Sequence, residues 1–256
     1  MASLYGVDGC RGGWIVAESD ISTENVRFHF VRRLRSLLDE ASPGRLVAID
    51  IPIGLPKDEP RSCDLQARKL LGWPRRSSVF PPPVRGALLK SFPEACRINL
   101  ERLNTRIPIQ TFHIMDKIHE VDVVMNRRKQ RYVHESHPEV TFAQLNGGRP
   151  MLNNKKTFAG RVERIRVLEN AGIDMPEELL RQWKSSLPSG AATTDDLLDA
   201  MACLVTARHI HAGSSHSLGR ADQEDAKGLL MEIVTCDTKV LAQSNVKETE
   251  YARLHG

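Results

Sequence analysis

The first fifty residues contain short apolar runs separated by glycine-rich or polar links. Runs of four to eight residues with partial alternation predict β-strands at 3–8, 14–19 and 26–31. Their short links favour an antiparallel meander. A short helix is predicted at 32–41, and the continuous apolar run LVAIDI at 46–51 is typical of a strand buried on both faces in a parallel sheet.

The rest of the chain is mainly helical in pattern. Helices are predicted at 60–72 with Gly72 as the C-cap, across most of 93–129, and at 157–171, 176–184 and 194–212. Strands are predicted at 131–135 and, at the edge of the sheet, at 228–235. The prolines of SSVFPPP at 77–83 predict an extended loop, because proline interrupts both helix and strand ladders. We therefore expect an α/β domain over 1–215 with a helical insertion at about 93–129, followed by an edge strand and a tail over 216–256.

Composition narrows the class of protein only slightly. The chain has 256 residues, 41% of them hydrophobic, which is enough for a sizeable core. The net charge of +4 is too small to indicate nucleic-acid binding by itself, and 5% aromatic residues argue weakly against a stacking platform for single strands. Five scattered cysteines without a C-x-x-C pair favour reduced thiols over a zinc site or disulfides. No signal or membrane-spanning pattern is visible, so we expect a cytoplasmic protein without membrane contact.

The helix predicted at 194–212 carries acids in an apolar setting. Asp196 and Asp199 are three residues apart and share one face. A buried carboxylate needs a hydrogen bond, an opposite charge or a metal ion. The alternative for Asp195 and Asp196 is a favourable interaction with the helix dipole in the first turn. The alternative for Asp199 is a buried salt bridge to a lysine or arginine.

Two more acids lie at the ends of predicted strands. Asp8 ends the first strand and Asp50 interrupts the apolar run near its carboxyl end, where ligands bind in open α/β sheets. Each could instead accept hydrogen bonds from the following turn. Together with Asp196 and Asp199 they predict one crowded pocket. Hard oxygen ligands without cysteine or clustered histidine favour Mg²⁺ or Mn²⁺.

Several blocks resemble a known family. GVDGCRGGW (6–14), VAIDIPIGLP (47–56), SSVFPPP (77–83), HESHPEV (134–140) and TDDLLDAMAC (194–203) are similar to a domain-of-unknown-function family described as predicted nucleases with an RNase H fold. The resemblance implies an RNase H-like mixed five-stranded sheet, three strands antiparallel and then two parallel, flanked by helices. The wider resemblance to RuvC-type resolvases implies that Asp8, Asp50, Asp196 and Asp199 are catalytic metal ligands. The chain departs from those enzymes by having aspartate rather than glutamate on the fourth strand.

Other residues are weaker candidates. Glu135 ends a predicted strand and is a possible additional metal ligand, with simple solvation as the alternative. Resolvase-like proteins place a basic residue in a position comparable to Lys155, Lys156 and Arg161, which implies phosphate contact; a solvated loop is the alternative. Arg68 lies in a helix with arginines near helical spacing and could also contact phosphate.

These observations lead to three hypotheses. The first is a nuclease that hydrolyses phosphodiester bonds in DNA or RNA with two Mg²⁺ or Mn²⁺ ions about 3.5–4 Å apart. The second is a nucleotide-binding ATPase or kinase-like protein, since GVDGCRGG loosely resembles a phosphate loop; a homodimer would then supply the second domain. The third is a non-catalytic nucleic-acid-binding module.

Overall fold

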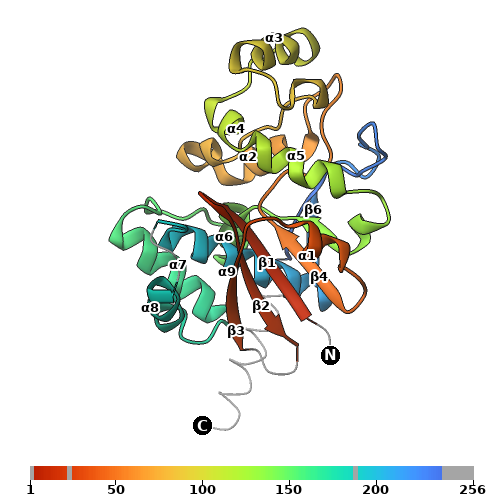
Figure 1. Cartoon of the computed structure of the whole chain (residues 1–256). Helices are drawn as coiled ribbons and strands as arrows, with labels where there is room; N and C mark the ends of the chain where they lie inside the picture. The colour runs from red at the N-terminus through yellow and green to blue at the C-terminus, as the bar shows by residue number, and fades with distance from the viewer. Residues whose placement is uncertain (1–2, 22–24, 187–189, 238–256) are drawn as a thin grey trace, which may run out of the picture.

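The predicted strands come together in one five-stranded sheet of mixed direction. The structure is a computed structural model that describes residues 3–21, 25–186 and 190–237 (Figure 1). The sheet has the order β3-β2-β1-β4-β5 and consists of β1 (Ser3–Cys10), β2 (Gly13–Asp20), β3 (Val26–Val31), β4 (Arg45–Ile49) and β5 (Val133–Glu135). The strands β1, β2 and β3 pair antiparallel, as predicted, whereas β4 pairs parallel to both β1 and β5.

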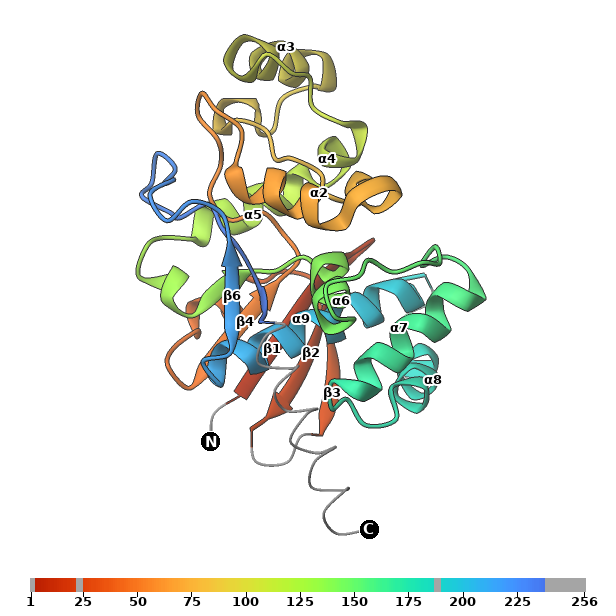
Figure 2. The same cartoon turned by 180° about the vertical axis from the view of Figure 1, so that it is seen from behind.

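A long helix covers one face of this sheet. Helix α9 (Thr194–His211) is buried from Leu197 to Ala207 because it lies between the sheet and three further helices, α6 (Pro138–Leu145), α7 (Phe158–Asn170) and α8 (Pro176–Ser186) (Figure 2). The close approach depends on Gly6 in β1. A Cβ atom at Gly6 would collide with the backbone of Ala200 and Leu204. The helix that carries the predicted acids is therefore held directly against the first strand.

The other face is covered by shorter helices. Helix α1 (Arg35–Asp39) and helix α5 (Met115–Val124) place Leu38, Ile118 and Val121 against the outward side chains of β1, β2 and β4. Helices α2 (Ser62–Arg75), α3 (Phe92–Leu103) and α4 (Ile109–His113) extend beyond the carboxyl end of β1, at the top of Figure 1. Three single-turn helices lie at Arg76–Ser78, Arg85–Ala87 and Lys129–Arg131.

The helices of the expected helical stretch at 93–129 pack in two different apolar clusters. Helices α3 and α4 belong to a small separate apolar cluster that includes Ala95 and Ile107. Helix α5 contributes instead to the core under the sheet. Gly72 has φ 57 and ψ −175, so the regular part of α2 ends there, as a C-cap glycine predicts.

The prediction that 228–235 adds to the edge of the main sheet is wrong. Strand β7 (Ile233–Cys236) pairs antiparallel with β6 (Ser215–Leu218) in a separate two-stranded sheet. The sequence SHSL of β6 is too polar to predict a strand, but its Leu218 packs with Ile233 against α2 and α6. Most of the predicted tail falls on 238–256, outside the described residues.

Two further findings bear on the class of protein. All five cysteines are buried and free: Cys10, Cys63, Cys96, Cys203 and Cys236. Among the described residues, none of the helices has both the length and the apolar character needed to span a membrane.

Candidate functional site

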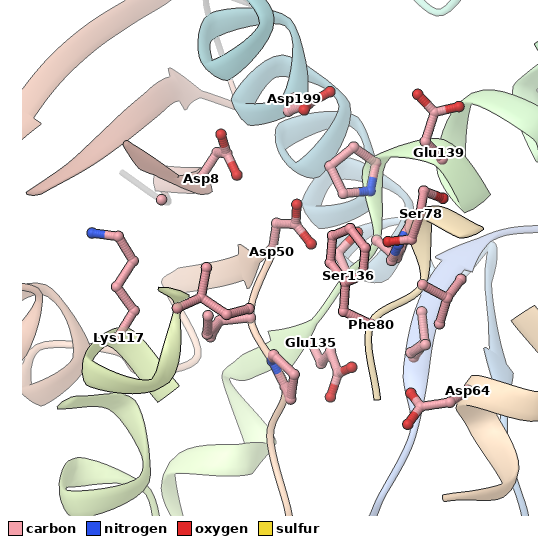
Figure 3. Close-up of a pocket in the computed structure, with 18 of the residues that line it drawn as sticks. Asp8, Asp50, Asp64, Ser78, Phe80, Lys117, Glu135, Ser136, Glu139 and Asp199 are labelled. Atoms are coloured by element: carbon pink, nitrogen blue, oxygen red, sulfur yellow. The ribbon is translucent and has the colours of Figure 1, made fainter. Parts of the chain in front are cut away.

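Three of the predicted aspartates meet at the carboxyl ends of the central strands. Asp8 lies two residues before the end of β1, and Asp50 directly follows the parallel strand β4. The amide of Asp50 donates to the carbonyl of Val7 at 2.8 Å, which holds the two strand ends side by side. Asp199 approaches from α9, and all three carboxyl groups line one pocket of about 260 Å³ (Figure 3).

The alternation of β1 explains why Asp8 faces this pocket. Tyr5 and Val7 belong to the core on the α5 side, whereas Leu4 and Cys10 belong to the core on the α9 side. Residues of the same parity share one face of a strand, so Asp8 points to the α9 side together with Leu4 and Cys10. The apolar strand pattern thus predicts the orientation of this acid.

The environment of the three carboxyl groups favours their protonated forms. Burial raises the pKa of Asp8 well above its ordinary value, and the charges of Asp50 and Asp199 raise it further. Burial also raises the pKa of Asp50, against the opposing effects of His137 and Lys155. Burial raises the pKa of Asp199 to about 6, although Lys155 lowers it.

A single lysine partly neutralises the cluster. Lys155 Nζ lies 2.7 Å from Asp199 Oδ2, which is the buried salt bridge that was the alternative for Asp199. The other oxygen, Asp199 Oδ1, is buried and has no hydrogen-bond partner within the described part of the chain. Across the described ranges, one ammonium group is thus ion-paired with one of the three carboxyl groups, and at least one buried acceptor is left without a donor.

Two other predicted acids have separate partners. The Asp196 carboxylate accepts a hydrogen bond from the amide of Thr193 at 2.6 Å, and the Asp196 amide donates to the Thr193 hydroxyl at 3.3 Å. This capping box stabilises the start of α9 and places Asp196 outside the pocket lining, although its charge still raises the pKa of Asp8. Glu135 lines the pocket but accepts hydrogen bonds from Arg61 Nη2 at 2.6 and 2.7 Å.

The predicted phosphate contacts are dispersed. Lys155 lines the pocket, whereas Lys156 is exposed nearby and Arg161 lies on the first turns of α7. Arg68 donates to the carbonyl of Arg76 at 3.4 Å and borders a separate proline-lined groove. Arg61, the N-cap residue of α2, is fully buried against Glu135.

Sequence reasoning missed several charged or polar residues of the pocket. Asp64, Lys117, His137 and Glu139 also line it. Lys117 donates to the carbonyl of Gly13 at 2.7 Å and lies 4.6 Å from the centroid of the Trp14 ring. His137 is fixed by contacts with the Val140 amide and the Ser78 carbonyl, at 3.4 and 3.3 Å. Asp64, Lys117 and Glu139 lie on α2, α5 and α6, and His137 is the N-cap residue of α6. No spacing in the sequence relates them to Asp8.

The donor chemistry fits a hard divalent cation. Carboxylate oxygens are the ligands that Mg²⁺ and Mn²⁺ prefer, and the partnerless Asp199 Oδ1 is suited to face a cation. Within residues 3–21, 25–186 and 190–237, no group of three or more Asp, Glu, His or Cys side chains is arranged to hold a metal ion. Mg²⁺ commonly binds through only one or two carboxylates, with water and substrate phosphate completing its shell. Asp8 and Asp50 are the residues that fit this role.

The fold and the pocket define a mixed α/β protein with an acidic site at the carboxyl ends of its central strands. Residues 6–224 match the family model described as a protein of unknown function, DUF429, and the chain belongs to this family. Comparisons with curated proteins and with solved structures return no match.

Proposed function

We propose that this protein is a divalent-metal-dependent nuclease built on an RNase H-like sheet. The proposal rests mainly on one observation, which is that Asp8, Asp50 and Asp199 share a pocket in which, among the described residues, Lys155 is the one lysine ion-paired with any of them. Buried carboxyl groups that repel one another are stabilised when a cation joins them. The positions also agree with those implied by the resolvase resemblance, on the first strand, after the parallel strand and on the long helix.

Different side chains around the pocket are expected to bind the cation, contact the phosphate and position the pocket wall. Asp8 and Asp50 would hold the cation, which when bound supplies Lewis-acid polarisation of a phosphoryl oxygen. Lys155 neutralises Asp199 and places its ammonium group where it can also contact a phosphate oxygen. His137 holds Val140 and Ser78 in place and orients the pocket wall.

Cleavage assays with purified protein test this proposal. Single-stranded and double-stranded DNA and RNA are incubated with Mg²⁺ or Mn²⁺, and Mn²⁺ binding is measured by calorimetry with and without substrate. We expect Asp8→Asn to weaken Mn²⁺ binding by more than the roughly 10- to 100-fold typical of losing an outer-shell partner, and to abolish cleavage. Asp222→Asn is the matched control, because the Asp222 side chain is 84% exposed.

Two results would overturn the proposal. One is the absence of metal-dependent cleavage of every substrate together with unchanged Mn²⁺ binding by Asp8→Asn. The other is a rise in Tm with Mg²⁺-ATP that requires Asp8 and no response to nucleic acid, which would favour the nucleotide-binding alternative.

A further inference from the structure

An exposed tryptophan lies at the end of α2. Trp73 is 80% exposed, although tryptophan is highly buried on average. The guanidinium of Arg76 lies over its ring at 5.6 Å from the centroid. Leu152, on the segment before α7, is 86% exposed. The surface formed by Trp73, Arg76, Leu152 and Lys156 is called the rim below.

Hydrogen bonds attach the two halves of the rim to each other. Arg75 Nε donates to the carbonyl of Met151 and Arg75 Nη2 donates to that of Leu152, both at 2.8 Å. These bonds hold the end of α2 beside the segment that leads to α7, on the side of the molecule seen in Figure 2. Trp73 and Leu152 therefore lie on two segments that hydrogen bonds hold together.

The same two segments form walls of the acidic pocket. Ser78, two residues after Arg76, lines the pocket, and so does Lys155, three residues after Leu152. A residue spans at most about 3.3–3.6 Å along an extended chain, so Arg76 and Leu152 lie within roughly 7 and 11 Å of these pocket residues, and Trp73, five residues before Ser78, lies within roughly 18 Å. A ligand that covers the rim can therefore also reach the pocket.

The charges of the rim favour an anionic ligand. Arg76 and Lys156 are exposed, and Arg68 lies directly behind Arg76. Glu163, an acid of α7 beside Leu152, accepts hydrogen bonds from the amides of Leu152 and Asn153 at 2.8 and 2.9 Å. An aromatic ring combined with an arginine and a lysine that form no ion pair among the described residues is the arrangement that binds single-stranded nucleic acid, by base stacking and phosphate contact.

We propose that the rim binds a single-stranded nucleic acid and leads it into the acidic pocket. One base stacks on Trp73, Arg76 contacts an adjacent phosphate, and the strand continues past Lys155. A duplex is not accommodated in the same way, since its bases are already stacked on one another. The assignment of the strand as the substrate rests on the proposed nuclease function, whereas binding to the rim does not.

Fluorescence and anisotropy titrations in EDTA test this inference without any cleavage. Trp73 is an exposed reporter, and Trp14 is fully buried. A short deoxythymidine strand should quench Trp73 and bind more tightly than a duplex of equal length. Trp73→Ala should weaken binding roughly 5- to 150-fold, the range for loss of one stacked base, and Trp73→Phe should restore most of it. Arg76→Glu should weaken binding and reduce its salt dependence.

The matched controls lie on segments that do not form the rim. Leu89→Ala removes another exposed apolar side chain, and Arg102→Glu makes the same charge reversal on α3, at the top of Figure 1. Both should leave strand binding unchanged.

The outcomes separate the two proposals. Equal binding of the strand by the wild type and by Trp73→Ala, tighter binding of the duplex, or quenching by anionic vesicles but not by the strand would overturn the rim proposal. Cleavage that survives loss of rim binding would leave the nuclease proposal intact. Strand binding through Trp73 without metal-dependent cleavage would contradict only the nuclease proposal.

Discussion

Two clusters of aspartates in this protein differ in how far their negative charges are neutralised by neighbouring basic residues. At the loop before β7, Asp122 and Asp225 both bind Arg85, and Lys227 lies 3.2 Å from Asp122. Burial raises the pKa of Asp122, but Arg85 outweighs burial and holds it below its ordinary value. In the pocket, by contrast, burial and neighbouring acids hold the pKa of Asp8 well above its ordinary value.

The difference separates structural carboxylates from those of a site. Asp225 also accepts hydrogen bonds from the amides of Leu55, Lys227 and Leu229, at 3.2, 2.7 and 3.0 Å. The Arg85 cluster therefore has matched charges and satisfied acceptors, and it fastens a loop to the core. The cluster of Asp8, Asp50 and Asp199 has neither property, and its unbalanced charge is available to a ligand.

The largest effect should come from breaking the balanced cluster. Arg85→Met leaves Asp122 and Asp225 without their shared partner, and loss of one member of a buried ion pair typically costs 3–5 kcal/mol. Because the Arg85 side chain is 29% exposed, we expect the lower end, roughly 3 kcal/mol in the free energy of unfolding. Urea denaturation measures it. A loss below that of the surface variant Arg97→Met would show that the cluster does not stabilise the loop.

The unbalanced cluster should respond to pH in the opposite sense from a salt bridge. Asp199 has a pKa of about 6 in the folded protein, above its ordinary value of 3.8, so the folded state binds more protons between these values. Stability is then fully present below about pH 4 and is lost as pH rises through 6. This displacement of the pKa corresponds to about 3 kcal/mol over the full titration, and about 2 kcal/mol of it is lost between pH 4.5 and 7.5.

Urea denaturation from pH 4.5 to 7.5, with and without Mn²⁺, measures this effect. Mn²⁺ should remove the loss, because a bound cation favours the ionised carboxylates. His134 and His209, whose pKa burial lowers, contribute in the opposite sense, so the wild type is compared with Asp199→Asn. A stability of the wild type that rises relative to Asp199→Asn over this range without metal would contradict the raised pKa of Asp199.

Removing one acid from the pocket should stabilise the protein. Asp8→Asn relieves the repulsion around a buried carboxyl group, so we expect a gain in stability of about 1 kcal/mol at pH 7 without metal. Most substitutions destabilise a protein by a similar amount. Asp225→Asn is the matched comparison and should destabilise, because it loses Arg85. Thermal denaturation of both variants gives the signs. A loss for Asp8→Asn would place Asp8 among the structural carboxylates.

The sequence predicts the sheet better than it predicts the site. The apolar runs locate β1 to β4 to within two residues at each end because core strands must carry apolar side chains. Strand β6 was missed because its pairing with β7 and its packing through Leu218 come from distant residues. Of the four acids that the sequence predicts in one pocket, Asp8, Asp50 and Asp199 line it and Asp196 does not.

The partners of the acids could not be predicted. Arg61 and Glu135 are 74 residues apart in the sequence, and nothing in either segment indicates that they form a buried pair. Lys155 was expected to contact phosphate, but its nearest partner is Asp199. Burial and charge balance depend on the folded arrangement, so the sequence identified the acids without showing which of them are neutralised.

The smallest effect concerns Asp196, whose place between cap and site can be tested directly. Thr193→Ala removes the hydroxyl that accepts a hydrogen bond from the Asp196 amide, and it leaves the Asp196 carboxylate in place. It should therefore cost about 1 kcal/mol of stability and leave Mn²⁺ binding unchanged. Asp196→Ala should cost a similar amount, since it removes the acceptor of the Thr193 amide. Mn²⁺ calorimetry on both variants then separates the roles. Weaker binding in Asp196→Ala alone would return Asp196 to the metal site, as the resolvase resemblance implies, whereas equal binding would leave it as the cap of α9.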